Sequence, residues 1–285
     1  MIKLISTILA AVMSITSVFI SARAPKDTSD FTPVLRFIAS SDSHIGGQPQ
    51  QPGRVQKMIK TGYAVADADE EYDKLDAVLI VGDLTNRGRK SQFLTFYASV
   101  KSVLRDGTQF LPVMAKSHDG GTMSNHDVHE FLGSLTGEKP DLHKVINGFH
   151  FIGLSASDLD EHYSEYQREW LIKQLDEAVA DDPDKPIFVF QHEHISDTVY
   201  GSYIRWGMDY FRDILVQYPQ VVDISGHSHY PLNDPRSIWQ DEFTAIGTGA
   251  LYYSEFTIDD VETYHPSDRF QTSTFWIIEA DASNR

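Results

Sequence analysis

The chain of 285 residues contains no cysteine. This absence excludes disulfide bonds, and it excludes thiolate ligands for any bound metal. A metal site in this protein would therefore be built from histidine, carboxylate and amide side chains. The 12 histidines and 41 acidic residues supply enough of them.

Positive charge is also scarce. The chain has 24 Lys and Arg against 41 Asp and Glu, so its formal net charge is −17. A surface of this charge repels polyanions, and we therefore expect no long nucleic acid among the partners. The same charge would concentrate divalent cations, but acidity for the sake of solubility is an equally good interpretation.

Long hydrophobic runs are missing except at the N-terminus. Lys3 precedes an apolar stretch, residues 4–20, and Ser-Ala-Arg-Ala follows it, which is the pattern of a secretory signal peptide over residues 1–24. Five of the 17 residues in the stretch are Ser or Thr, so we expect no stable membrane span unless the signal is retained. Cleavage after Ala22 is the alternative, because Pro25 would follow a cut after Ala24.

These features predict a secreted or extracytoplasmic protein with a linker over residues 25–33 and one folded domain over 34–285. Apolar runs of strand length recur along that domain, at 34–40, 77–81, 110–115, 149–154, 187–190, 221–224, 243–246 and 275–278. Helical spacing of apolar residues is present at 55–67, 91–104, 164–180 and 202–217. The alternation in the first half and the strand-rich last 65 residues predict an α/β fold with mixed sheets covered by helices, and not a purely parallel one.

Polar residues gather where five of these runs end. In chain order the five ends read "DSH" at 42–44, "GD" at 82–83, "KSHD" at 116–119, "QH" at 191–192 and "GHSH" at 226–229. A single Asp or His at such a position is ordinarily a turn, cap or surface residue. Strand ends of one sheet converge, however, and five such ends together predict a common site.

The donors in this set suit a particular kind of metal. Carboxylate oxygen and imidazole nitrogen in mixture favour Mn, Fe or Zn, and we expect two divalent ions to bind. The candidate ligands from the strand ends are Asp42, His44, Asp83, His192, His227 and His229. Asp83 is placed centrally enough to bridge the two ions.

The order of these motifs resembles the calcineurin-like metallophosphoesterase family, whose pattern is Asp-x-His, Gly-Asp, Gly-Asn-His-Asp/Glu, His and Gly-His-x-His. The resemblance runs from Asp42 to His229. It implies a four-layer αββα sandwich of two mixed β-sheets flanked by helices, with a dinuclear site at the strand ends. It assigns Asp42, His44, Asp83 and His229 to one metal, and Asp83, His192 and His227 to the other.

The same resemblance assigns catalytic roles to two neighbours. His118 corresponds to the family histidine beside the leaving-group oxygen, where an imidazole can donate a proton near neutral pH. Asp119 is expected to orient His118, with a turn residue as the alternative. Lys116 and Ser117 depart from the family's Gly-Asn. Ser117 would be a weaker ligand of the second metal, and Lys116 would either strain the backbone at a glycine position or bind a substrate phosphate.

Further candidates flank these motifs. Arg87 resembles an arginine that contacts phosphate in one branch of the family, and a surface role in a turn is its alternative; Asn86 is similarly open. His194 is a second choice to His192 as a ligand. Tyr200, Tyr203, Trp206, Tyr252 and Tyr253 would either wall a substrate pocket or pack the core.

The predicted function is an exported, metal-dependent phosphoesterase that hydrolyses a small phosphate ester through a metal-activated hydroxide. A phosphodiester or nucleotide-like substrate is preferred over a phosphomonoester. The alternative is a non-catalytic relative that binds metal and a phosphorylated ligand, because Lys-Ser-His replaces Gly-Asn-His. Nothing in the sequence specifies an oligomeric state.

Overall fold

A computed structural model describes residues 31–283, with gaps at 122, 158–161 and 259–261. The predicted signal peptide and most of the predicted linker lie outside the described residues. Thr32–Arg285 forms one compact unit. Across the described residues, no helix is long and apolar enough to cross a membrane.

Two mixed β-sheets form the centre of this unit. The first has the strand order β14-β1-β2-β3, in which β1, β2 and β3 are parallel and β14 is antiparallel to β1. The second has the order β10-β11-β9-β6-β5-β4, with antiparallel strands only at its two edges. The bounds are β1 Pro33–Ser40, β2 Ala77–Val81, β3 Gln109–Val113, β4 Leu142–Ile146, β5 Phe149–Gly153, β6 Ile187–Phe190, β9 Val221–Ser225, β10 Ile238–Gln240, β11 Thr244–Gly247 and β14 Trp276–Asp281. The eight predicted strands are all present.

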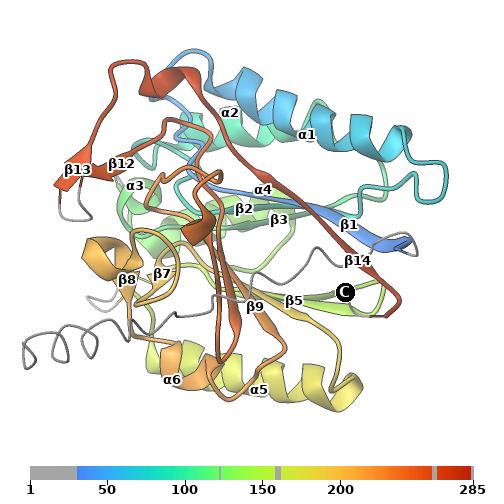
Figure 1. Cartoon of the computed structure of the whole chain (residues 1–285). Coiled ribbons are helices and arrows are strands. Elements are labelled where there is room, and N and C mark those ends of the chain that lie inside the picture. Colours follow the sequence, from blue (N-terminus) through green and yellow to red (C-terminus); the bar gives the residue numbers. More distant parts are fainter. Residues whose placement is uncertain (1–30, 122, 158–161, 259–261, 284–285) are drawn as a thin grey trace, which may run out of the picture. The chain divides into compact units, whose positions relative to one another are not determined.

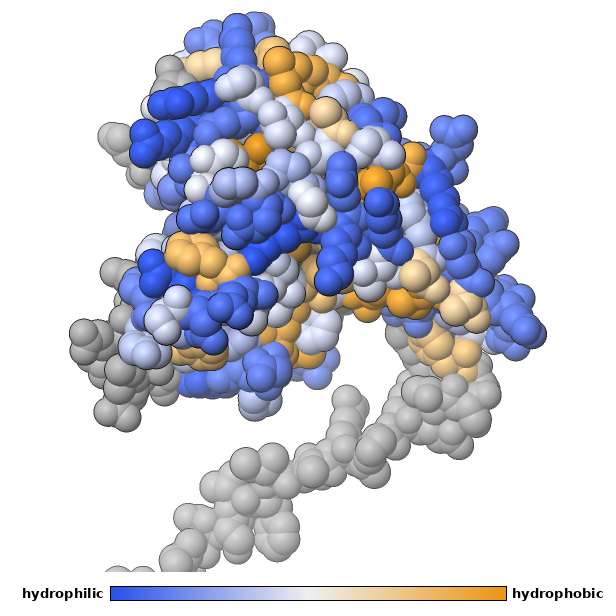
Figure 2. All heavy atoms as spheres, turned by 90° about the horizontal axis from the view of Figure 1, so that it is seen from above, coloured by the Kyte–Doolittle hydropathy of each residue, from blue (hydrophilic) through white to orange (hydrophobic). Residues whose placement is uncertain are grey.

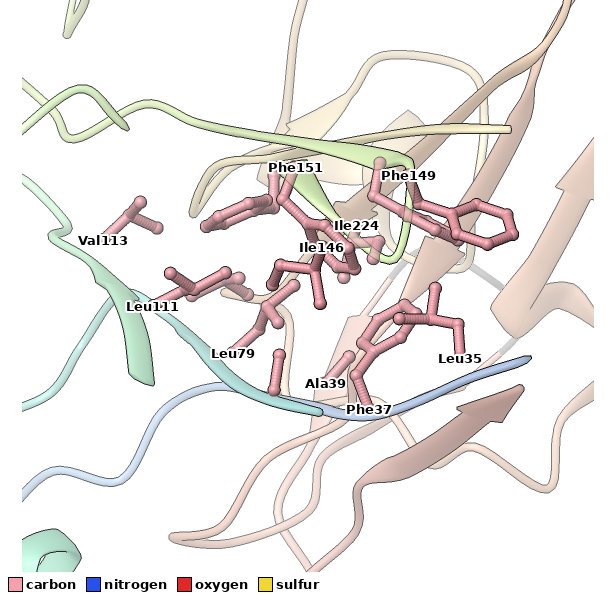
Figure 3. Packing of buried hydrophobic residues seen from close by; sticks show 14 of the residues in the cluster. Leu35, Phe37, Ala39, Leu79, Leu111, Val113, Ile146, Phe149, Phe151 and Ile224 are labelled. Carbon is pink, nitrogen blue, oxygen red and sulfur yellow. The ribbon is translucent and has the colours of Figure 1, made fainter. Parts of the chain in front are cut away.

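The two sheets pack face to face through an apolar layer (Figure 3). Phe37 of β1 contacts Phe151 of β5 and Phe188 of β6, with ring centroids 5.1 and 4.8 Å apart. Both faces of these strands are covered, which is why the runs that predicted them are apolar throughout instead of alternating.

Helices cover the outer faces of the sheets and complete four layers (Figure 1). The helices α1 Gln51–Asp67, α2 Lys90–Lys101 and α4 Asn125–Thr136 pack on the first sheet, and α5 Glu165–Asp181 and α6 Arg212–Leu215 pack on the second. On the face shown in Figure 2, hydrophilic residues separate small hydrophobic areas. The predicted αββα architecture is therefore confirmed.

Helix α5 begins as its sequence predicts. Ser164 caps it with its hydroxyl on the Gln167 backbone N–H, and the Gln167 side chain returns to the Ser164 N–H. The helix ends at Asp181, before the Pro-containing turn.

The helix predicted over residues 202–217 is wrong. That segment forms a π-helical turn, Ser202–Trp206, then strand β8, Gly207–Met208, which pairs with β7, His194–Ile195, and only then α6. Gly207 explains the break, because its backbone is extended and a Cβ there would lie 2.1 Å from the Ser202 carbonyl oxygen. Four further features were not predicted from the sequence: α4, β4, β10 and the hairpin of β12 Phe256–Ile258 and β13 Glu262–Tyr264.

We expect Phe151→Ala to lower the free energy of unfolding by about 3–5 kcal/mol, because it empties the centre of the layer between the sheets. Chemical denaturation followed by circular dichroism measures this change. Tyr166→Ala is the control, since Tyr166 is 70% exposed on α5, and we expect it to stay within about 0.5 kcal/mol. Equal losses for the two variants would contradict the proposed core.

A second prediction concerns a buried carboxyl group in β9. Asp223 is fully buried, and its Oδ1 accepts a hydrogen bond from Gln191 Nε2 at 2.7 Å. Burial raises the pKa of Asp223 to about 7. The folded state therefore keeps a proton that the unfolded chain has already released, so this group costs stability as the pH rises from about 4 through 7.

Asp223→Asn removes that titration at nearly constant size. The stability of the variant relative to the natural chain should rise by on the order of 3 kcal/mol between pH 5 and pH 8. Urea unfolding of both proteins at matched pH values tests this, and a difference that does not change with pH would contradict it.

Candidate metal centre

The candidate ligands come from the carboxyl ends of four parallel strands. Asp42 and His44 follow β1, Asp83 follows β2, His192 follows β6, and His227 and His229 follow β9. Backbone hydrogen bonds tie these ends together, from Asp42 N to the Gly82 carbonyl at 3.1 Å and from Gly226 N to the His192 carbonyl at 2.9 Å. The site therefore lies where the two sheets meet at their carboxyl edges.

The backbone of these residues is unusual. Eight described non-glycine residues have positive φ, and five of them are candidate ligands. They are Asp42 at 53°, His44 at 42°, Asp83 at 49°, His227 at 71° and His229 at 58°. Left-handed backbone at non-glycine residues clusters at functional sites, where surrounding structure enforces it. Here it turns each side chain out of its strand and toward the common centre.

One group of ligand atoms consists of Asp42, His44 and His229. Asp42 Oδ1 lies 3.0 Å from His229 Nε2 and 3.7 Å from His44 Nε2. The two imidazole Nε2 atoms are 3.4 Å apart.

A second group consists of Asp83, His192 and His227. His192 Nε2 lies 3.5 Å from Asp83 Oδ2 and 3.1 Å from His227 Nδ1. Asp83 also lies close to the first group, because the same Oδ2 is 3.5 Å from His44 Nε2. One carboxylate oxygen is thus equally far from a histidine of each group, which is the placement expected of a bridging ligand.

Backbone carbonyls fix the tautomers of two histidines. Nδ1 of His192 lies 2.9 Å from the Val81 carbonyl, and Nδ1 of His229 lies 3.2 Å from the Tyr253 carbonyl. Each Nδ1–H donates to its carbonyl, which leaves Nε2 free to bind a metal ion. His227 presents Nδ1 instead.

Several buried polar atoms at this centre have no hydrogen-bond partner among the described residues. They include Asp42 Oδ1, Asp83 Oδ1 and His44 Nδ1. Unsatisfied buried carboxylate oxygens are costly unless a cation pairs with them. Burial would raise the pKa of Asp42, but His229 and His44 lower it well below its usual range, so the carboxylate is charged. Charge, donor types and unsatisfied atoms all fit divalent cations.

His118 lies at the rim of the centre and is 44% exposed. Its ring packs edge-on against His44 with centroids 4.6 Å apart, and its Nε2 is 4.0 Å from Asp83 Oδ2. Its Nδ1 lies 3.0 Å from the Asn86 carbonyl, so this carbonyl orients the ring.

The sequence led us to expect that Asp119 orients His118, but the two side chains do not interact directly. Its buried carboxylate accepts hydrogen bonds from Thr85 N at 2.9 Å, Ala115 N at 3.1 Å and Leu84 N at 3.2 Å. Burial, and then the nearby Asp83, raise the pKa of Asp119 to about 7. Asp119 thus fastens the segment that carries His118 to the segment that follows Asp83, which places His118 through the backbone.

The residues that depart from the family pattern are accessible. Lys116 is half-buried directly before α3, Ser117–Gly120, and Ser117 and His118 are exposed in that helix. The backbone of Lys116 is ordinary right-handed helix, with φ −71° and ψ −49°, so the expected strain at this position is absent. Arg87 is exposed in the turn after Asp83.

The remaining candidates separate into two classes. His194 is buried, and its two ring nitrogens lie 2.8 and 2.7 Å from the hydroxyls of Ser225 and Ser228, so it is not a ligand. Tyr252, Tyr253 and Trp206 pack on the candidate ligands His44, His229 and His227, with centroids 4.9, 4.2 and 4.7 Å apart. The contributions of Val81, Tyr253 and Asn86 were missed because backbone carbonyls leave no signal in a sequence.

A family model described as calcineurin-like phosphoesterase matches residues 35–231 of the chain. The chain belongs to this family. The match covers every candidate ligand of this metallophosphoesterase and ends before β10.

Two individual proteins are similar to it. A protein of Arcobacter nitrofigilis, named as a probable glycerophosphodiester phosphodiesterase GpdQ, is 29% identical over 204 residues, which cover 66% of this chain and 70% of that protein. The structure of purple acid phosphatase PPD1 from yellow lupin (Lupinus luteus) seeds matches with a TM-score of 0.52 and 15% identity. The match covers 88% of this metallophosphoesterase but only 54% of the lupin protein, and it shows likeness of fold alone.

Gly82 offers a test of the second ligand group. Its φ is +84°, and a Cβ there would lie 2.3 Å from Nδ1 of His192. Gly82→Ala should therefore displace His192 and lower the metal content of the protein after loading with Mn²⁺ and dialysis, as measured by elemental analysis.

Gly107 is the matched control, because its φ is +92° and a Cβ there meets nothing within 4 Å. Gly107→Ala should lose stability, about 1 kcal/mol, but keep its metal. Equal metal content in the two variants would argue against His192 as a ligand.

Proposed function

We propose that this metallophosphoesterase hydrolyses a small phosphodiester with two divalent ions, drawn from Mn, Fe and Zn. Asp42, His44 and His229 would hold one ion, His192 and His227 the other, and Asp83 both. The observation that carries the proposal is the position of Asp83 Oδ2, 3.5 Å from a histidine of each ligand group. The family membership and the arrangement of the unsatisfied carboxylates support it.

Bound ions of this kind lower the pKa of water and neutralise the charge of phosphoryl oxygens. The chain itself supplies the acid. Because Nδ1 of His118 faces the Asn86 carbonyl, the second proton of its imidazolium is on Nε2, the atom nearer Asp83. His118 is exposed enough to meet a substrate, and it would transfer this proton to the departing alkoxide.

One observation supports a phosphodiester substrate over a phosphomonoester, and another supports a location of the protein outside the cytoplasm. The Arcobacter relative is named as a phosphodiesterase. The cysteine-free, acidic composition and the signal-like residues 1–24 suit an exported protein.

Lys116 and Arg87 are placed to meet the anionic part of a substrate only if they turn inward from the rim, so we assign them a secondary role in binding.

The first test is hydrolysis of bis(p-nitrophenyl) phosphate by the purified chain after chelation, with and without added Mn²⁺. Turnover that depends on metal and disappears in Asp83→Ala is the expected result. Turnover that survives in Asp83→Ala would overturn the proposal.

The non-catalytic alternative makes a different prediction for Ser117. If the natural chain lacks activity while it still binds metal, Ser117→Asn should restore turnover. If the natural chain is already active, Ser117→Asn should change its turnover only modestly, because the exposed Ser117 is at the rim. The natural chain and Ser117→Asn, assayed side by side, therefore distinguish an enzyme from a degenerate relative.

The role of His118 predicts a dependence on the leaving group. His118→Ala should lower kcat by roughly 10²–10⁴-fold for a diester with an alkyl alcohol as leaving group, which needs a proton. The loss should be much smaller for p-nitrophenolate, which leaves as an anion. Equal losses for both substrates would show that His118 does not act as the acid.

A further inference from the structure

The strongest feature not used by the chemistry above is a hydrogen-bonded belt of buried side chains behind the metal ligands. Its members are Ser41, Thr248, Ser225, His194 and Ser228, all at most 5% exposed. They come from the ends of β1, β9 and β11 and from β7.

The belt begins at a ligand. Ser41 donates its hydroxyl hydrogen to Asp42 Oδ2, and Thr248 Oγ1 lies 2.7 Å from Ser41 Oγ. Thr248 also contacts Ser225 through the Ser225 carbonyl, which accepts from Thr248 N at 2.8 Å. These contacts keep the second oxygen of Asp42, Oδ1, directed at the metal centre.

The belt ends between two other ligands. Ser228 separates His227 from His229, and its hydroxyl lies 2.7 Å from His194 Nε2. The other nitrogen of His194 lies 2.8 Å from the Ser225 hydroxyl on the last residue of β9. A neutral imidazole donates one hydrogen bond and accepts the other, and a serine hydroxyl can complement either. His194 thus clamps the turn back onto the strand from which it departs.

We propose that His194 is a positioning residue for the metal centre, because it holds Ser228 and thereby the two histidines on either side of it. His227 and His229 have φ of 71° and 58°, a conformation that needs enforcement by neighbours. The Ser228 side chain points to His194, while the flanking side chains of His227 and His229 point to the candidate ligands His192 and Asp42. The proposal rests on the metal centre assigned above.

Ser228→Ala tests the clamp with the smallest change. It removes one hydroxyl and changes no ligand residue, and we expect the Kd for Zn²⁺ to rise on the order of 10–100-fold because His227 and His229 are held less firmly. The measurement is competition between the full chain and a chromophoric chelator of known affinity, which needs no catalytic turnover. His194→Phe should give a similar loss, and His194→Gln, which can still donate and accept, a smaller one.

Two controls make the result specific. His143→Ala removes a histidine of β4 that bonds to Gln174 and His150 instead of to the ligand turn, and the Kd of this variant should not change. Asp83→Asn should weaken binding in any case; if it does not, the metal centre itself is misassigned. If Asp83→Asn weakens binding and Ser228→Ala leaves the Kd within about twofold, the clamp proposal is overturned. Should His194→Phe fail to fold by circular dichroism, Ser228→Ala decides alone.

A kinetic readout separates positioning from general damage. In Ser228→Ala the concentration of metal needed for half-maximal activity should rise, while KM for the diester at saturating metal stays within about twofold. A change confined to KM would contradict a role exerted through the metal ligands.

Discussion

The metal centre depends on one constraint, which is the free-energy cost of burying two carboxylates, Asp42 and Asp83. Both lose water and they repel each other. Neither residue is more than 2% exposed, and each keeps one carboxylate oxygen without a partner in the described part of the chain. Such groups are tolerable only where positive charge compensates them. Cations shared by the four surrounding imidazoles would provide that compensation, and the sheets, turns and belt hold these side chains in place.

The sheets do this because their carboxyl edges meet. A parallel strand delivers its last residue to the same edge as its neighbour, so residues 42, 83, 192 and 227, which are remote in sequence, converge at one edge. Figure 1 shows helices on the outer faces of the sheets, where α1, α2 and α4 on one side and α5 and α6 on the other bury apolar residues of the strands.

Much of this arrangement could be predicted from the sequence, because its signals are local. Apolar runs marked the strands, and the capping box at Ser164 marked the start of α5. The residues at the strand ends indicated which side chains would converge. The helix expected over 202–217 is absent because the apolar residues with helical spacing there belong to separate short elements, a π-helical turn, β8 and α6, and the extended Gly207 lies between the turn and α6.

What could not be predicted depends on contacts between distant segments. Asp119 was read as a partner of its neighbour His118, yet its carboxylate binds backbone N–H groups 34 residues away at Thr85. His194 looked like a spare ligand, and only the fold reveals that two serines occupy both its nitrogens. The Asn86, Val81 and Tyr253 contacts use backbone oxygens, which every residue possesses.

The pairing of β1 with β14 has a consequence for how the molecule comes into being. All candidate ligands precede residue 230, but β1, which leads to Asp42 and His44, is flanked by the strand Trp276–Asp281 at the other end of the chain. Until that last strand is synthesised, β1 remains an unprotected edge and the inner layer stays open on one side. Contacts of such long sequence separation form late and slowly. The strand that leads to Asp42 and His44 therefore gains both of its neighbours only after residues 276–281 have been synthesised.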